Sequence, residues 1–318
     1  MRMLIGALAL LAGASGAAAA DYTCSQLKLI VPYPAGGATD VATRVVAERL
    51  DAALKKAVVV ENRGGATGNI GTAAVVTSPP DGCTLLVNAT VIATFPYSFA
   101  KLNYDPLKDL APVGGLGITP TLIVAAPSVP ANDLKSLIGW ANSKPEGLNF
   151  STAGYGLQQH LAVEEIGQRS GAKFTHVAYK GGGTAMTDLM TARLDFGGFL
   201  GGTTKPLIRD GQLKALAIAQ DKRSDLLPDV PTTAEQGFPG INGGVHFMFF
   251  APAGTPKETI ALLNAEISRI IGDAVIKERF ATIGFDPTPL GPDEVAALMK
   301  KTGDDFAPII KRLNIKLD

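Results

Sequence analysis

The stretch LIVPYPAGGATD at residues 29–40 determines how the rest of this sequence is interpreted. Its apolar, β-branched beginning predicts a strand, which the two prolines end because proline cannot donate to a sheet. Two glycines then form a loop without side chains, while Thr39 suits the N-cap and Asp40 the first turn of a helix reaching Leu54. A bare loop at a helix N-terminus presents free backbone N–H groups, so the stretch predicts an anion site.

Strand, small polar loop and helix recur in this order along the chain. The alternation predicts parallel α/β sheets, which bind ligands at the carboxyl ends of their strands. Apolar segments at 113–124 and 244–250 are expected to cross between two halves. We therefore expect one domain from 21–122 plus 246–318 and another from 123–245, each a mainly parallel sheet flanked by helices. The expected strands are 27–31, 57–60 (short and buried), 84–87, 148–150, 174–177, 194–196 and 213–218, with a bare loop at 197–202.

The first 20 residues have the pattern of a cleavable secretory signal. Arg2 precedes a short apolar run and an Ala-x-Ala ending, which predicts cleavage after Ala20. Neither this run nor any later one is long enough to predict stable membrane insertion. The full chain has 29 basic and 29 acidic residues, so loss of Arg2 leaves one net negative charge. Such a balance argues against nucleic acid as a partner.

The chain has only two cysteines, Cys24 and Cys83, and each directly precedes an expected strand. Both would therefore lie at the same edge of a parallel sheet, where they could form a disulfide after export. Two buried free thiols are the alternative, and the sequence leaves the choice open.

The usual signatures of nucleotide binding and catalysis are missing. The chain contains no Gly-x-x-x-x-Gly-Lys-Ser/Thr and no Gly-x-Ser-x-Gly, and the glycines at 154–156 lack the third glycine of a dinucleotide loop. Its three histidines, His160, His176 and His246, do not form a metal motif. His160 and Glu164 are interpreted as a helix surface pair. We expect a binding protein rather than an enzyme, with no cofactor or metal and with a carboxylate as the anion.

Seven short motifs follow one another along nearly the whole chain: IVPYPAGGATD (30–40), ENRGGATG (61–68), PDGCTLL (80–86), YDPLKDL (104–110), HLA (160–162), VAYKG (177–181) and VPTTAE (230–235). In sequence and order they resemble the Bug-type periplasmic receptors, the substrate-binding components of tripartite tricarboxylate transporters. The resemblance implies a monomeric, periplasmic clamshell of the type II periplasmic-binding-protein class, with its ligand in a cleft between two domains. It also implies that a small mono-, di- or aromatic carboxylic acid is delivered to the large and small membrane subunits of a transporter.

The resemblance also implies which residues surround the ligand. From the first domain these are Tyr33, Pro34, Ala35, Gly36, Gly37, Thr39, Asp40, Thr67, Gly68 and Thr90. From the second domain they are Ser151, Thr152, Gly154, Tyr155, Tyr179, Gly181 and Phe199.

Two positions depart from the family pattern. Leu157 replaces the serine that usually follows the Gly-x-Gly, and residues 197–200 lack the acidic residue that commonly follows this strand. Both changes make the expected pocket less polar, which favours a ligand with an apolar or aromatic body. Two other functions stay open at this point: a secreted enzyme acting on small acids or esters, and a sensor subunit for a signalling receptor.

Overall fold

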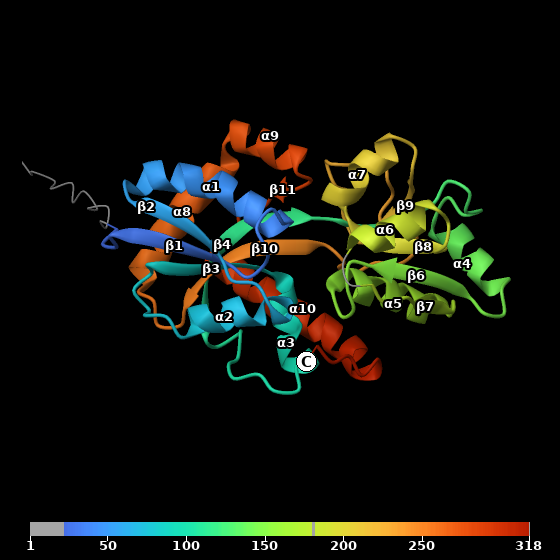
Figure 1. Cartoon of the computed structure of the whole chain (residues 1–318), viewed down its shortest axis with the longest axis horizontal. Coiled ribbons are helices and arrows are strands. Elements are labelled where there is room, and N and C mark those ends of the chain that lie inside the picture. Colours follow the sequence, from blue (N-terminus) through green and yellow to red (C-terminus); the bar gives the residue numbers. More distant parts are fainter. Residues whose placement is uncertain (1–21, 180–181, 318) are drawn as a thin grey trace, which may run out of the picture.

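The computed structural model describes residues 22–179 and 182–317. Two α/β units, each built on its own sheet, lie side by side along the long axis of the molecule, which confirms the predicted fold class (Figure 1). Among the described helices, none is both long enough and apolar enough to cross a membrane. The predicted signal, its cleavage after Ala20 and the expected ligand residue Gly181 lie outside the described residues.

The first unit is built on a sheet with the strand order β11-β4-β10-β3-β1-β2. Its strands are β1 (Gln26–Val31), β2 (Ala57–Asn62), β3 (Thr84–Ala89), β4 (Leu110–Thr119), β10 (Val245–Pro252) and β11 (Asp286–Pro287). Its helices are α1 (Ala38–Leu54), η1 (Ala66–Gly68), α2 (Asn69–Val76), η2 (Thr90–Thr94), α3 (Phe95–Ser98), α8 (Lys257–Gly272), α9 (Ala274–Thr282) and α10 (Pro292–Arg312), where η denotes a 3₁₀ helix.

The second unit is built on a sheet with the order β7-β6-β8-β5-β9. Its strands are β5 (Thr121–Ala125), β6 (Leu148–Thr152), β7 (Phe174–His176), β8 (Phe196–Leu200) and β9 (Lys214–Ile218). Its helices are α4 (Leu134–Asn142), α5 (Gln158–Ser170), α6 (Gly182–Met190) and α7 (Gly201–Arg209).

Both sheets are mixed rather than mainly parallel. Strand β1 pairs in parallel with β2 and β3, and β6 pairs in parallel with β7 and β8, as predicted. Strand β10 runs antiparallel to β3 and β4, and β5 runs antiparallel to β8 and β9. Strands β5 and β10 follow directly from the two crossings, where a chain that passes straight across and back enters each sheet without a helical crossover. The short β11 also runs antiparallel to β4 but does not lie at a crossing.

The chain crosses between the sheets at Pro120, which separates β4 from β5, and returns just before Val245. The Thr121 hydroxyl donates a hydrogen bond to the Gly243 carbonyl and so ties the two crossings together. A third connection is apolar, because Phe306 and Ile309 of α10 pack in one cluster with Leu161 of α5. The predicted crossings are therefore present, whereas the exact domain boundaries stay a prediction.

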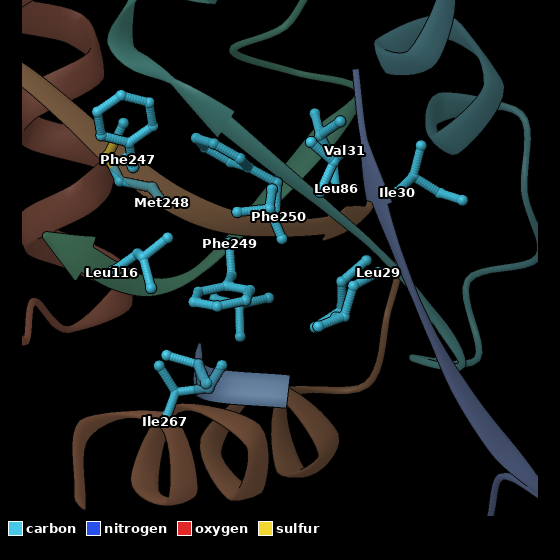
Figure 2. Close-up of a cluster of buried hydrophobic side chains, with 14 of the residues drawn as sticks. Leu29, Ile30, Val31, Leu86, Leu116, Phe247, Met248, Phe249, Phe250 and Ile267 are labelled. Atoms are coloured by element: carbon cyan, nitrogen blue, oxygen red, sulfur yellow. The ribbon is translucent and has the colours of Figure 1, made fainter. Parts of the chain in front are cut away.

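The core of the first unit fills both faces of its central strands. Leu29 of β1 and Phe249 of β10 are completely buried. Figure 2 shows Phe249 facing Ile267, which α8 contributes from below the sheet. Burial of an aliphatic or aromatic side chain of this size contributes about 1.5–3 kcal/mol, so this layer fixes the strands that end at the pocket described below.

Two local predictions were wrong. Strand β2 is not buried, because it pairs only with β1 at the sheet edge, and its Val59 is 44% exposed. Residues 197–202 are not a bare loop but the end of β8 and the start of α7. The glycines there serve close packing, since a Cβ on Gly198 would lie 3.1 Å from Val163 Cγ2 and 3.2 Å from the carbonyl oxygen of Gln159.

Cys24 and Cys83 form a disulfide, with their Cα atoms 5.5 Å apart. This decides between the two alternatives that the sequence left open. The bond joins the segment before β1 to the segment before β3, and these two strands are neighbours in the sheet.

Candidate ligand-binding site

A pocket of about 240 Å³ lies between the two sheets. Its walls come from both units and include the loop between β1 and α1, the end of β3, the start of α5 and the start of β10. Of the twelve described residues that line it, seven are apolar and none is charged. The lining residues are Tyr33, Gly37, Ala38, Thr39, Ala89, Val91, Leu157, Gln158, Gln159, Leu200, Val245 and Phe247.

Helix N-termini dominate the polarity of this pocket. Gly37, Leu157 and Leu200 are the N-cap residues of α1, α5 and α7, and none of these helices has a side-chain hydrogen bond at its cap. First-turn N–H groups have no partner within a helix, and the helix dipole adds partial positive charge. Helix α7 contributes less, because its first N–H, on Gly201, already donates to the Pro120 carbonyl. Within the described part of the pocket, backbone donors can therefore bind an anion without a fixed cation.

Asp40 organises the loop between β1 and α1 rather than facing the pocket. Its carboxylate accepts hydrogen bonds from the Gly36 N–H (2.9 Å), Asn62 Nδ2 (3.0 Å) and Arg44 Nε (3.1 Å). Burial raises the pKa of Asp40, but the bonds from Arg44, Gly36 and Asn62 outweigh it and hold the pKa below its ordinary value. Asp40 is not among the residues that line the pocket, and its oxygens accept bonds within the loop, so its contact with the ligand stays a prediction.

Thr39 lies two positions further into the helix than predicted. Helix α1 begins at Ala38, and Gly37, with an extended backbone, is its N-cap. Thr39 is therefore a first-turn residue, and it is buried in the pocket wall. Of the other expected residues in this loop, Gly37 lines the pocket, while Pro34 and Ala35 are exposed beside it.

Tyr33 is held in the pocket wall by a polar chain. Its hydroxyl donates to Asn88 Oδ1 at 2.9 Å, and Asn88 Nδ2 donates to Thr72 Oγ1 at 3.0 Å. Burial, followed by the neighbouring Tyr104, raises the pKa of Tyr33, so the phenol is neutral. Gly68 makes room for this ring, because a Cβ there would lie 3.3 Å from the tyrosine oxygen. The expected residues Thr67 and Gly68 belong to η1, and Gly68 packs against the Tyr33 ring rather than lining the pocket itself.

Thr90 and Gln158 connect the two units beside the pocket. The Thr90 hydroxyl donates to Gln158 Oε1 at 2.5 Å, and Gln158 Nε2 donates to the Gly244 carbonyl at 3.2 Å. The hydroxyl of Thr90, an expected ligand residue, therefore donates its proton to α5 in this structure. The next residue, Gln159, also lines the pocket, but its side-chain oxygen is buried without a hydrogen-bond partner among the described residues.

Apart from Gly181, which lies outside the described residues, none of the residues expected from the second unit lines this pocket. Ser151 and Thr152 end β6 instead of beginning a loop, and their hydroxyls donate to backbone oxygens, of Thr152 (3.4 Å) and Gly154 (2.9 Å) respectively. Tyr179 donates to the Asp188 carboxylate at 2.6 Å, and Tyr155 is 41% exposed.

Phe199 also lies elsewhere than expected. Its side chain is buried in a core cluster of the second unit with Leu122 and Leu189, since residue 199 belongs to β8. The next residue, Leu200, lines the pocket in its place. The segment 197–200, which lacks the acidic residue of the family pattern, therefore lines the pocket through Leu200 rather than through Phe199.

His160 is not a surface residue, as it was interpreted from the sequence. It is 1% exposed, and its Nδ1 accepts the Gly156 N–H at 3.1 Å, which shapes the turn before α5. The ring of His176 lies 4.2 Å from that of His160. Burial, followed by the nearby His160, lowers the pKa of His176 to about 3, so His176 adds no charge to the anion site.

The sequence did not predict most of the apolar wall. Ala89 and Val91 flank Thr90, and Val245 and Phe247 alternate at the start of β10. One sequence signal could have predicted these pocket residues: they lie at or just after the end of β3 and at the start of β10, next to the expected crossings. A pair of glutamines at the start of a helix, Gln158 and Gln159, was a second signal.

Comparisons with known proteins agree with this arrangement. The model of the tripartite tricarboxylate transporter family receptor matches residues 42–315. Protein BugT of Bordetella pertussis is 34% identical over 323 aligned residues, which cover 99% of this chain and 97% of BugT. Rpa4515 of R. palustris, solved with adipate, has a TM-score of 0.80 at 29% identity, covering 93% of this chain and 99% of that one. MatC of Rhodopseudomonas palustris, solved with malate, has a TM-score of 0.74 at 29% identity, covering 90% of this chain and 98% of that one.

Proposed function

Because the chain belongs to the family of tripartite tricarboxylate transporter receptors, we propose that it binds one small carboxylate in the pocket between its sheets. Proteins of this family are periplasmic solute receptors rather than enzymes. In the proposed function, the closed receptor delivers the acid to the large and small membrane subunits of a transporter. Cleavage after Ala20, action as a monomer, and domains of 21–122 plus 246–318 and 123–245 belong to the same proposal.

The observation that carries this proposal is the meeting of α1 and α5 at one pocket without a charged wall. The two uncapped N-termini come from different units, so a carboxylate between them is held by both. Such an anion favours the closed arrangement because it interacts with both units only when they are together. Tyr33, Gly37 and Thr39 are the proposed contacts from the first unit, and Leu157, Gln158 and Gln159 those from the second.

The size and lining of the pocket support a small acid with an apolar body. A volume of 240 Å³ is below the range of about 300–1,000 Å³ typical of drug-sized ligands. Leu157, Leu200, Val245 and Phe247 form an apolar side opposite the polar helix ends. The ligands of the two solved neighbours, adipate and malate, are both small carboxylic acids, which supports the same class for this chain.

Mass spectrometry and thermal shift together test the proposal. Native mass spectrometry of freshly purified protein should release a carboxylic acid. Thermal unfolding with succinate, malate, adipate and phenylacetate should give a higher midpoint for at least one acid, with about 2.7 kcal/mol of stabilisation at 100 times its Kd. A midpoint unmoved by every acid, with no acid released, would contradict the proposal. Chemical change of a bound acid would favour the enzyme alternative.

A further inference from the structure

The turn that leads into α5 is held by a side chain from the first turn of the helix itself. Gly156 directly precedes the N-cap Leu157, and its N–H donates to His160 Nδ1 at 3.1 Å. The Leu157 carbonyl then accepts the N–H of Leu161, which begins the helix. The bond to His160 therefore closes the turn at the point that determines where α5 starts.

Aromatic side chains fix the position of the His160 ring. Its centroid lies 4.2 Å from that of His176, 4.8 Å from that of Tyr155 and 6.0 Å from that of Phe150. His176 Nε2 in turn lies 3.1 Å from the hydroxyl oxygen of Thr152, at the end of β6. The Nδ1 acceptor is thus held between the strand that precedes the turn and the helix that follows it.

The bond from Gly156 also defines the tautomer of His160. A ring nitrogen accepts a hydrogen bond only when it carries no proton, so the proton of this neutral ring lies on Nε2. Nε2 is 3.5 Å from Glu164 Oε1. The ring therefore adds no positive charge near the pocket, and what it contributes there is the geometry of the turn.

We infer that His160 is a positioning residue for the carboxylate, because it orients the first N–H groups of α5 through its bond to Gly156. This inference rests on the proposed function, in which those N–H groups hold the acid. Leu157 and the two residues after it line the pocket, whereas His160 is not among the described lining residues. A shift of the turn would move the donors of α5 away from those of α1, and the acid would then lose bonds at one end of the pocket.

Two substitutions separate the acceptor from the ring. His160→Asn places Oδ1 where Nδ1 lay, so it keeps the bond to Gly156 but removes the ring. His160→Phe keeps a ring but removes the acceptor. Both variants should unfold at a lower temperature than wild type, because the first loses packing and the second leaves the buried Gly156 N–H without its partner.

Ligand affinity distinguishes the two variants. Calorimetry would use whichever acid among succinate, malate, adipate and phenylacetate raises the wild-type unfolding midpoint most. His160→Asn should bind this acid within about threefold of wild type, and His160→Phe about tenfold more weakly, because only the first keeps the turn closed.

Phe196→Leu is the matched control for lost stability. Phe196 is buried on β8, and its ring lies 5.4 Å from that of Phe150 in the same aromatic cluster. This variant should unfold at a lower temperature but keep the wild-type affinity when binding is measured well below that temperature.

The remaining outcomes would contradict the role of His160. Affinity lost equally in His160→Asn and His160→Phe, lost in His160→Asn alone, lost to the same extent in Phe196→Leu, or unchanged in both His160 variants would overturn the inference while leaving the carboxylate receptor intact. Binding of no acid by the wild-type protein would overturn the proposed function and this inference together.

Discussion

The carboxylate of Asp40 joins the loop between β1 and α1, the end of β2 and the second turn of α1. It does so through Gly36, Asn62 and Arg44, which all donate to it. The loop that places Gly37 in the pocket wall is therefore held by a charged group that does not itself line the pocket. This separation is useful because a carboxylate facing the pocket would repel an anionic ligand.

Asp40→Asn should lower the free energy of unfolding by about 2 kcal/mol at pH 7, since bonds to a buried charge are lost. A pKa held below its ordinary value means that the stabilisation is complete above the unfolded pKa of about 4 and disappears as pH falls through the folded value. The difference between wild type and variant in denaturant titrations should therefore shrink below pH 4.

The matched control is Asp304→Asn, because Asp304 forms an exposed ion pair with Lys300. Exposed pairs contribute about 0–1 kcal/mol, so this variant should remain close to wild type. Equal effects of the two substitutions would contradict the role given to Asp40.

At the scale of elements, α7 connects the ligand pocket to the opposite unit. Its N-cap, Leu200, lines the pocket, and Gly202 in its first turn touches the turn after α9. A Cβ on Gly202 would lie 2.7 Å from the Ile283 carbonyl oxygen, and Gly284 packs against Gly202 with a φ of +75°. The two backbones approach this closely only because both positions lack side chains.

Gly202→Ala should therefore favour separation of the units and weaken ligand binding about tenfold, or 1.4 kcal/mol. Small-angle scattering should show a larger radius of gyration for the variant with ligand than for wild type. Gly139→Ala in α4 is the control, since a Cβ there meets nothing within 4 Å. Unchanged affinity and scattering for Gly202→Ala would show that this contact does not limit closure.

The sequence predicted the elements with clear local signals. Strand β1, the loop after it and helix α1 were found because prolines and glycines end one element and open the next. The β8–α7 segment was expected as a loop because glycines 197, 198, 201 and 202 resemble one locally. In the structure, Gly198 lets α5 approach and Gly202 lets the Ile283–Gly284 turn approach. Partners distant in sequence decide such positions, which is why the sequence favoured Phe199 as a pocket residue and gave no prediction for Gln159.

At the scale of the whole molecule, a polar contact joins the units near the glycine contact. The Ser224 hydroxyl of the second unit donates to Asp286 Oδ2 of β11 at 2.6 Å. Burial of Asp286, aided by the charge of Asp225 and opposed by the bond from Ser224, raises its pKa above the ordinary value. The folded protein therefore binds this proton more readily than the unfolded chain.

The pKa of Asp286 is raised on folding, whereas the pKa of Asp40 is lowered. The stability that Asp286 contributes is present at low pH and decreases as pH rises through its folded pKa. Asp286→Asn, which keeps an acceptor for Ser224, should be more stable than wild type at pH 7, and this gain should shrink on acidification toward pH 4. Asp225→Asn should show part of the same gain. Lower stability of Asp286→Asn at pH 7 would show that the charge itself favours the contact between the units.

The disulfide between Cys24 and Cys83 makes the stability of the fold depend on whether the chain is in a reducing or an oxidising compartment. The two thiols are separated by 59 positions and can pair only where both are in an oxidising compartment. Until then the chain lacks the cross-link, which for a loop of this length is worth about 4 kcal/mol on the chain-entropy model. Under the proposed export, the chain before translocation would thus be less stable than the cross-linked receptor by that amount. It would reach full stability only once both cysteines have left the reducing compartment.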